Sequence, residues 1–209
     1  MPASGYPVPA STCESETRFK NSRFIGTVGP TASVEAAQEF IKSIRNRYPD
    51  ASHHVYAFSI GHGATVTEGM SDDGEPSGTA GRPVLAVVKG SGLGDVAVVI
   101  TRFFGGTKLG TGGLVRAYTQ TAQQVLSELE TTRKIERISA TLHVPYRLHA
   151  ACRRALDEVG AVIRDEVFDA QVTIELLVAE EDRQALVEAV TEASAGSASL
   201  TLDGAGNIP

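Results

Sequence analysis

Apolar residues recur every three or four positions in two long segments of the chain, and this spacing predicts two amphipathic helices. The first covers residues 34–48, with Ser33 as its candidate N-cap and Pro49 directly after it. The second begins after a glycine-rich segment and covers residues 114–129. Both helices are long enough to cover a sheet.

Shorter apolar segments lie between and before these helices and predict strands. Residues 18–28 have the composition of a strand or hairpin, and residues 54–60 that of a strand. The runs at 84–88 and 95–101 are rich in β-branched residues, so we expect two buried strands joined by a turn. Residues 69–83 are dense in Gly, Pro, Ser and Asp and predict a long loop.

From residue 138 onward the pattern describes a second, separate unit. Its elements follow the order strand, helix, strand, strand, helix, strand, at residues 138–144, 148–159, 161–167, 171–178, 182–193 and 197–202. Gly160 is the predicted C-terminal cap of the first of these helices. This order is that of ferredoxin-like domains. We therefore predict an α+β protein with a boundary near 131–137: a flexible tail over 1–16, one domain over 17–132 and another over 133–209.

Composition supports a globular protein without a membrane segment. The chain has 209 residues, of which 42% are apolar, so it can form a buried core. Its longest apolar runs are far shorter than the ~20 residues that cross a bilayer, and its first residues lack a signal-peptide pattern. Cys13 and Cys152 are far apart in the sequence, and we expect free thiols in a reducing cytoplasm.

The charge is negative and unevenly distributed. The formal net charge is −6, with −1 over residues 1–132 and −5 over residues 133–209. A protein without an overall basic surface binds nucleic acid only through a local patch.

A glycine-rich segment between the strand at 95–101 and the following helix is the strongest candidate for such a patch. Glycine lets the backbone come close to a ligand, and a helix N-terminus offers free N–H groups to an anion. Positive side chains flank the segment. The candidate residues are Arg102, Gly105, Gly106, Lys108, Gly110, Gly112, Gly113 and Arg116. The alternative is a joint in which glycine only permits tight packing.

The segment does not match the known nucleotide-binding motifs. Lys108 is followed by leucine, whereas a P-loop lysine is followed by serine or threonine. The glycine spacing also fails the dinucleotide-binding fingerprint, because Val115 stands where that fingerprint has its third small residue. A classical NTPase and a Rossmann dehydrogenase are therefore not supported.

The loop at 69–83 carries three carboxylates, Asp72, Asp73 and Glu75, for which three interpretations exist. Carboxylate oxygens suit Mg²⁺, but Asp-Gly and Glu-Pro are also typical of turns, and we favour the turn. A third possibility is pairing of Asp72 or Glu75 with Arg82, Arg102 or Lys108, which would stiffen the loop. The adjacent His53 and His54 point to opposite faces of a strand and do not chelate one ion together.

Four segments resemble the YigZ/IMPACT family: Ser22–Gly26, His53–Ala57, Asp72–Pro83 and Thr101–Leu114. The resemblance covers residues 17–130, and the remaining third is similar to the small C-terminal domain of the bacterial members. It implies a domain like domain 2 of ribosomal protein S5 followed by a ferredoxin-like domain, as in the last domains of elongation factor G. The family has no established catalytic activity. Its eukaryotic members are linked to translation initiation through protein partners, and nucleic-acid or ribosome binding is suggested for bacterial ones.

These observations lead to a hypothesis of a cytoplasmic, non-enzymatic, translation-related protein without cofactor or metal. It would bind RNA or a ribosomal or translation-factor surface through the glycine-rich segment. A supporting loop would be ordered beside it, formed by Asp72, Asp73, Glu75, Ser77, Gly78, Thr79 and Arg82, together with His53 and His54. The alternatives are a Mg²⁺-dependent phosphotransferase or hydrolase that uses Asp72, Asp73 or Glu75, and a protein-interaction module that acts through the acidic second domain.

Overall fold

The computed structural model of the chain describes residues 5–63 and 65–202, which form two α+β units. One unit runs from Tyr6 to Lys134 and the other begins at Ile135, so the division falls within the predicted boundary segment. Residues 1–4 and 203–209, part of the predicted tail and of the predicted last domain, lie outside the described residues.

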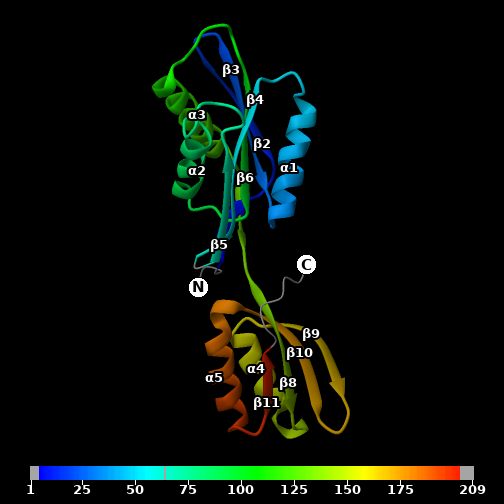
Figure 1. Cartoon of the computed structure of the whole chain (residues 1–209). Helices are drawn as coiled ribbons and strands as arrows, with labels where there is room; N and C mark the ends of the chain where they lie inside the picture. The colour runs from blue at the N-terminus through cyan, green and yellow to red at the C-terminus, as the bar shows by residue number, and fades with distance from the viewer. Residues whose placement is uncertain (1–4, 64, 203–209) are drawn as a thin grey trace. The chain divides into compact units, whose positions relative to one another are not determined.

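The first unit is built on a five-stranded antiparallel sheet with helices on both faces (Figure 1). The helix α1 (Val34–Arg47) covers one face, and α2 (Gly81–Gly90) and α3 (Thr111–Ser127) cover the other. In spatial order the strands are β2 (Cys13–Phe19), β3 (Ser22–Pro30), β6 (Val96–Phe103), β4 (His53–His62) and β5 (Thr65–Ser71). The central strand β6 therefore lies between β3 and β4.

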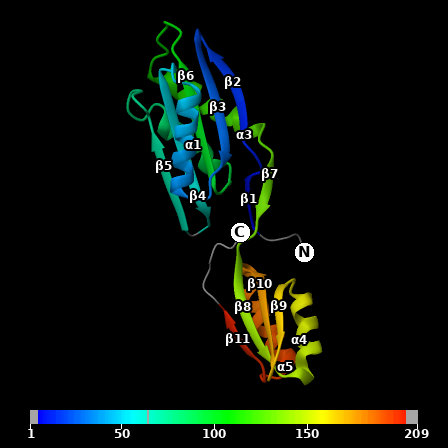
Figure 2. The ribbon, with the colours of Figure 1, turned by 90° about the vertical axis from the view of Figure 1, so that its right-hand side faces the viewer.

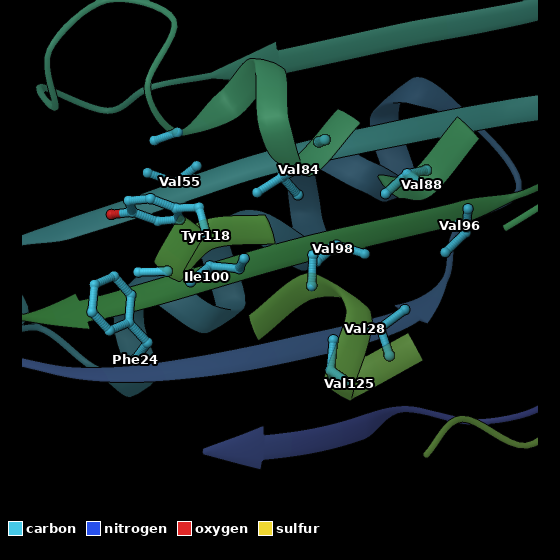
Figure 3. Close-up of a cluster of buried hydrophobic side chains, with 14 of the residues drawn as sticks. Phe24, Val28, Val55, Val84, Val88, Val96, Val98, Ile100, Tyr118 and Val125 are labelled. Atoms are coloured by element: carbon cyan, nitrogen blue, oxygen red, sulfur yellow. The ribbon is translucent and has the colours of Figure 1, made fainter. Parts of the chain in front are cut away.

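The main core lies between this sheet and the pair α2 and α3 (Figure 3). Alternate residues of the central strands point into it, such as Val98 and Ile100 of β6. The ring of Phe24 from β3 meets that of Tyr118 from α3 edge to face, with centroids 5.3 Å apart. The intervening residues of β6, Ala97 and Val99, pack against α1 on the opposite face. Because both faces are covered, β6 is apolar on both sides.

Three predicted elements of the first unit are confirmed, and for the first of them the structure also shows the predicted cap. The helix α1 starts where the spacing places it, and the Oγ of Ser33 accepts a hydrogen bond of 3.1 Å from the N–H of Ala36, which caps the first turn. The predicted strand at 95–101 is β6, and the predicted helix after the glycine-rich segment is α3.

The predicted strand at 84–88 is wrong, because these residues belong to the helix α2. Val84 and Val88, four residues apart, are fully buried on one helical face, while Ala86 is exposed. A run of five apolar residues fits a buried strand as well as a helix. The β-branched residues in this run favour the strand, which is the wrong choice here. The carboxylate of Asp72 accepts hydrogen bonds from the N–H groups of Ala80 and Gly81, so the helix start is stabilised by a residue distant in sequence.

The flexible tail predicted over 1–16 is wrong for residues 6–9 and 13–16, which belong to strands. The strand β1 (Tyr6–Pro9) pairs with β7 (Thr131–Lys134), and β2 begins at Cys13. The residues of β7 fall in the segment that composition marked as a boundary. Pairing between residues more than 120 positions apart carries no local sequence signal, and four-residue strands show little periodicity.

The hairpin of β4 and β5 was also missed. The predicted strand at 54–60 is longer than expected, because β4 continues to His62. The strand β5 extends to Ser71, which shortens the predicted loop at its start. Most of β5 is exposed, so it lacks the alternation that identifies a half-buried strand.

The second unit has the predicted order of elements (Figure 2). The helices α4 and α5 pack side by side against its four-stranded antiparallel sheet, whose spatial order is β11-β8-β10-β9. The left-handed Gly160, with φ of 74°, ends α4 as predicted. The elements are β8 (Arg137–Val144), α4 (Tyr146–Glu158), β9 (Val162–Phe168), β10 (Val172–Ala179), a single 3₁₀ turn (Glu180–Asp182), α5 (Arg183–Ser194) and β11 (Ser199–Leu202).

Cys13 and Cys152 are free thiols. Among the described residues, no helix combines the length and the apolar character needed to span a bilayer.

Candidate functional site

The segment between β6 and α3 presents a series of unpaired backbone donors. The N–H of Gly105 donates to the Oγ of Ser22 at 3.3 Å, and that of Leu114 donates to the carbonyl of Gly110 at 2.9 Å. Within the part of the chain that the structure describes, the N–H groups of residues 106–113 have no hydrogen-bond acceptor. The N-cap of α3 is Gly110, which has no side chain to satisfy them.

The glycines of this segment are required for different structural reasons. A Cβ on Gly105 would lie 1.9 Å from the carbonyl oxygen of Asn21, so this glycine is required for packing. Gly106 and Gly110 have φ of 80° and 76°, which favours glycine. Gly112 is different, since its backbone is helical and nothing lies within 4 Å of a Cβ placed there. Packing therefore explains part of the glycine pattern and leaves Gly112 unexplained.

Positive side chains surround the unpaired donors. Lys108 and Arg116 are exposed, and neither forms an ion pair with any described residue. Lys20, at the turn between β2 and β3, donates from Nζ to the carbonyl of Lys108 at 3.1 Å and brings a third cation to the segment. Sequence reasoning missed Lys20, because only the fold brings this turn beside the glycine-rich segment.

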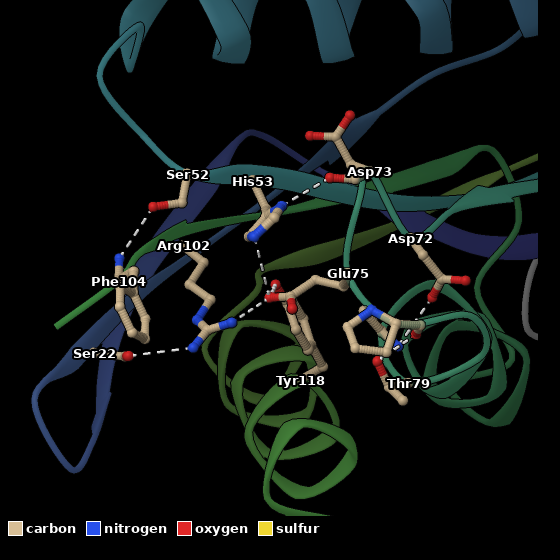
Figure 4. Close-up of polar contacts among 12 residues, drawn as sticks. Ser22, Ser52, His53, Asp72, Asp73, Glu75, Thr79, Arg102, Phe104 and Tyr118 are labelled. Carbon is tan, nitrogen blue, oxygen red and sulfur yellow. Dashed lines mark hydrogen bonds and ion pairs between the residues drawn. The ribbon is translucent and has the colours of Figure 1, made fainter. Parts of the chain in front are cut away.

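Arg102 does not have the role that the sequence suggested. It is only 5% exposed, and its Nη1 lies 2.5 Å from Oε1 of Glu75 (Figure 4). Nη2 contacts the Oγ of Ser22 at 3.4 Å, while Nε is buried without a partner. The expectation that Arg102 adds free positive charge at the surface is therefore wrong, because Glu75 neutralises it.

Glu75 joins the long loop to the sheet and to α3. Besides Arg102, its Oε1 accepts a hydrogen bond of 2.8 Å from the hydroxyl of Tyr118, and Nε2 of His53 lies 3.9 Å away. Burial and the charge of Glu75 raise the pKa of Tyr118 above its ordinary value, so the phenol stays protonated and donates. Removal of one partner from a buried ion pair costs about 3–5 kcal/mol. The pairing of Glu75 with Arg102 is among the alternatives predicted above.

The other two carboxylates of the loop have their own partners. Asp72 accepts hydrogen bonds from the N–H groups of Gly78, Ala80 and Gly81 at 2.8 to 3.0 Å. Burial disfavours its charged form, but these donors hold the pKa of Asp72 below its ordinary value. Asp73 pairs with Arg45 at 2.5 Å and accepts the N–H of His54 at 2.6 Å. Of the interpretations given above, stabilisation of a turn therefore describes Asp72.

The two histidines point to different partners, as the strand geometry predicts. Nδ1 of His53 lies 2.8 Å from the carbonyl oxygen of Asp73, and Nε2 of His54 lies 3.0 Å from that of Tyr48. Burial lowers the pKa of His54, so it is neutral at pH 7. Within the described chain, no three or more His, Cys, Asp or Glu side chains are grouped to hold a metal ion.

The remaining residues of the supporting loop are structural or exposed. Oγ1 of Thr79 donates to the carbonyl of Pro76 at 2.6 Å, and Gly78 has φ of 76°. Ser77 and Arg82 are exposed. Through Glu75, Arg102 and Ser22, this loop is connected to the start of the glycine-rich segment.

Phe104, which sequence reasoning also missed, lies at the start of that segment. It is 49% exposed, and the guanidinium carbon of Arg102 lies over its ring at 5.5 Å from the centroid. Its N–H donates to the Oγ of Ser52 at 3.2 Å. In the sequence it follows a buried apolar strand directly and is not distinguished from that strand.

Comparison with known families covers both units. Residues 20–126 match the Impact N-terminal domain, and residues 142–197 match a domain of unknown function, DUF1949.

Several whole proteins are similar along most of the chain. The chain is 37% identical over 192 residues to an IMPACT family member of Haemophilus influenzae, covering 91% of this chain and 93% of the relative. It is 39% identical to the IMPACT family member YigZ of Escherichia coli, covering 80% and 82%. A crystal structure described as that of a hypothetical protein is 36% identical, with a TM-score of 0.68, and covers 94% of this chain and 96% of that one.

Proposed function

The chain belongs to the IMPACT family, and from this premise we propose that it acts in translation by binding RNA phosphates, on free RNA or on the ribosome, through residues 105–113. One observation carries the proposal. The N–H groups of residues 106–113 have no acceptor within the described chain, at the N-terminus of a 17-residue helix. Such groups, together with the helix dipole, favour an anion.

The surrounding charges support a phosphate ligand. Lys20, Lys108 and Arg116 supply positive charge at this place, although the whole chain carries −6. A phosphate that approaches the N–H groups therefore meets a local positive field within an acidic protein. Gly112 agrees with this, because a missing side chain where nothing else packs leaves room for the ligand.

The architecture of the two units supports the two domain folds that the resemblance to the family implies. The strand order β11-β8-β10-β9 and the order of elements in the second unit support a ferredoxin-like domain. The first unit, with its five-stranded sheet, is the part that we assign to the domain like domain 2 of ribosomal protein S5. Neither fold fixes a function, so the argument depends on the site.

The arrangement of the carboxylates disfavours the Mg²⁺-dependent enzyme. Asp72 is bound by three N–H groups, Asp73 by Arg45, and Glu75 by Arg102 and Tyr118. A metal ion would have to displace these partners. We therefore propose a binding protein rather than a phosphotransferase.

The proposal is tested by reversal of two charges. In the variant Lys108→Glu with Arg116→Glu, we expect loss of co-sedimentation with ribosomes and of binding to RNA. Because few phosphates are contacted, the wild-type affinity should fall weakly with salt, with a logarithmic slope of roughly −2 for about three contacts.

A matched control separates the site from net charge. Lys42 and Arg154 are exposed and form no ion pair with a described residue, so Lys42→Glu with Arg154→Glu changes the charge equally elsewhere. This control should retain most of the binding. Undiminished RNA binding by the Lys108/Arg116 variant would reject the proposal.

A further inference from the structure

Phe104 is a large apolar side chain held at the surface. It is 49% exposed, next to Gly105 and to the unpaired N–H groups that follow. An exposed phenyl ring is not unusual by itself, but this ring is held in place beside the proposed phosphate site.

The contacts of Phe104 fix its position from two sides. Its N–H is bound by Ser52, and the guanidinium of Arg102 lies over its ring. Arg102 is in turn held by Glu75 and Ser22, so the group behind the ring is rigid (Figure 4). Cation–π attraction keeps the ring against the guanidinium.

One face of the ring is thus covered by a fixed cation, while about half of the residue remains open to solvent. The charge of Arg102 is paired with Glu75, so the guanidinium behind the ring is held in one place. A flat, electron-rich group on the open face would complete a stack of ligand, ring and guanidinium. Because the ring is already ordered, binding would cost little side-chain entropy.

We propose that Phe104 is a stacking platform for an unpaired nucleobase, so that the site binds single-stranded rather than double-helical RNA. This inference rests on the proposed function, because residues 106–113 hold the neighbouring phosphates. Bases inside a duplex are stacked on each other, whereas bases of single strands and loops stack on protein aromatics. Phosphate contacts supply affinity without discrimination, and Phe104 supplies the choice of strand state.

The test compares three ligands of equal length by fluorescence anisotropy: an unstructured mixed-sequence RNA single strand, its duplex, and an abasic ribose-phosphate oligomer. The wild-type protein should bind the single strand most tightly. Phe104→Ala should weaken single-strand binding by about 5- to 150-fold. Binding of the abasic oligomer and its salt dependence should stay unchanged, because the phosphate contacts remain.

Two further variants serve as controls. Phe104→Trp keeps an aromatic surface and should retain tight binding of the single strand. Phe168 of the second unit is 56% exposed, and Phe168→Ala should have no effect on any of the three ligands. Circular dichroism melting of Phe104→Ala verifies that the fold is intact.

The outcomes separate this inference from the proposed function. If the wild-type protein binds all three ligands equally, or if Phe104→Ala binds the single strand as wild type does, the stacking role is rejected while phosphate binding stands. Equal weakening of single-strand and abasic binding by Phe104→Ala also rejects stacking. If the wild-type protein binds none of the three, the proposed function fails, and the inference fails with it.

Discussion

Asp95 is the residue on which the closing contacts of the first unit converge. Its carboxylate accepts hydrogen bonds from the hydroxyl of Tyr6 at 2.9 Å, the N–H of Gly61 at 2.8 Å and Nζ of Lys134 at 2.5 Å. Its side chain is only 6% exposed. Burial disfavours its charged form, but these three donors hold the pKa of Asp95 below its ordinary value. One carboxylate thus joins β1, β7 and the end of β4.

The substitution Asp95→Asn tests this role by removal of the charge. Asparagine keeps the size and tolerates the φ of 50° at this position. We expect the free energy of unfolding at pH 7 to fall by about 2–3 kcal/mol, because a hydrogen-bonded charge is lost. The measurement is urea denaturation followed by circular dichroism.

The pH dependence of the free energy of unfolding provides a second test of Asp95, and its direction is defined. Because the folded pKa of Asp95 is depressed, its stabilisation is complete above the unfolded value of about 3.9 and is lost as the pH falls toward the folded pKa. Wild type and Asp95→Asn should therefore differ constantly from neutral pH down to about pH 5, and converge below pH 4. The exposed Asp50→Asn serves as control, and a difference that grows toward acid pH would contradict the assignment.

At the same scale, Arg102 shows what the sequence does not specify about a site. An arginine at the end of a strand, just before a glycine-rich segment, has the same local pattern whether it faces a ligand or the interior. Its partners Glu75 and Ser22 are 27 and 80 positions away. The charge pattern points to a region of the chain, whereas the direction of each cation depends on tertiary contacts.

At the scale of elements, the segment before α3 combines a helix N-terminus with a residue that weakens it. Glycine within a helix costs about 0.5–1 kcal/mol relative to alanine. Gly112 lies in the first turn, has helical geometry, and has no neighbour that excludes a Cβ. A helix that keeps glycine there gives up stability without a packing reason.

The substitution Gly112→Ala is therefore expected to separate stability from binding. We expect the free energy of unfolding to rise by up to about 1 kcal/mol, because alanine favours the helix. RNA affinity should decrease, since the added methyl group would lie where the proposed function places the phosphate. Thermal unfolding and fluorescence anisotropy measure the two effects.

Gly105→Ala provides the contrast. Its Cβ would meet the backbone of Asn21, so this variant should lose stability. If Gly112→Ala binds RNA as tightly as wild type does, the backbone near Gly112 does not contact the ligand.

The elements themselves were predictable where one face is buried and the other is exposed. In the second unit, alternation along β10 and helical spacing along α4 identified each element, because every face has a single environment. In the first unit, residues 84–88 of α2 were predicted as a strand, since five consecutive apolar residues fit the spacing of a helix and that of a strand equally well. Its start depends on Asp72, and no local rule connects that carboxylate to the helix.

At the scale of the whole molecule, every residue of the candidate site belongs to the first unit. The glycine-rich segment, the turn with Lys20 and the supporting loop all lie between Tyr6 and Lys134. This unit has its own core, and its first and last strands, β1 and β7, pair with each other. The second unit has a separate core and most of the negative charge.

We therefore expect a chain truncated after Glu136 to fold and to bind RNA. Its affinity should be equal to that of the full chain or higher, because the removed residues 137–209, which hold 6 Lys/Arg and 12 Asp/Glu and so carry −6, no longer repel phosphates. Circular dichroism and anisotropy with the same RNA single strand measure folding and binding, and Lys108→Glu with Arg116→Glu in the truncated chain should abolish the binding. The result also distinguishes the two units: a truncated chain that folds but does not bind the RNA that the full chain binds would place RNA contacts in the second unit and contradict the assignment of the site to the first.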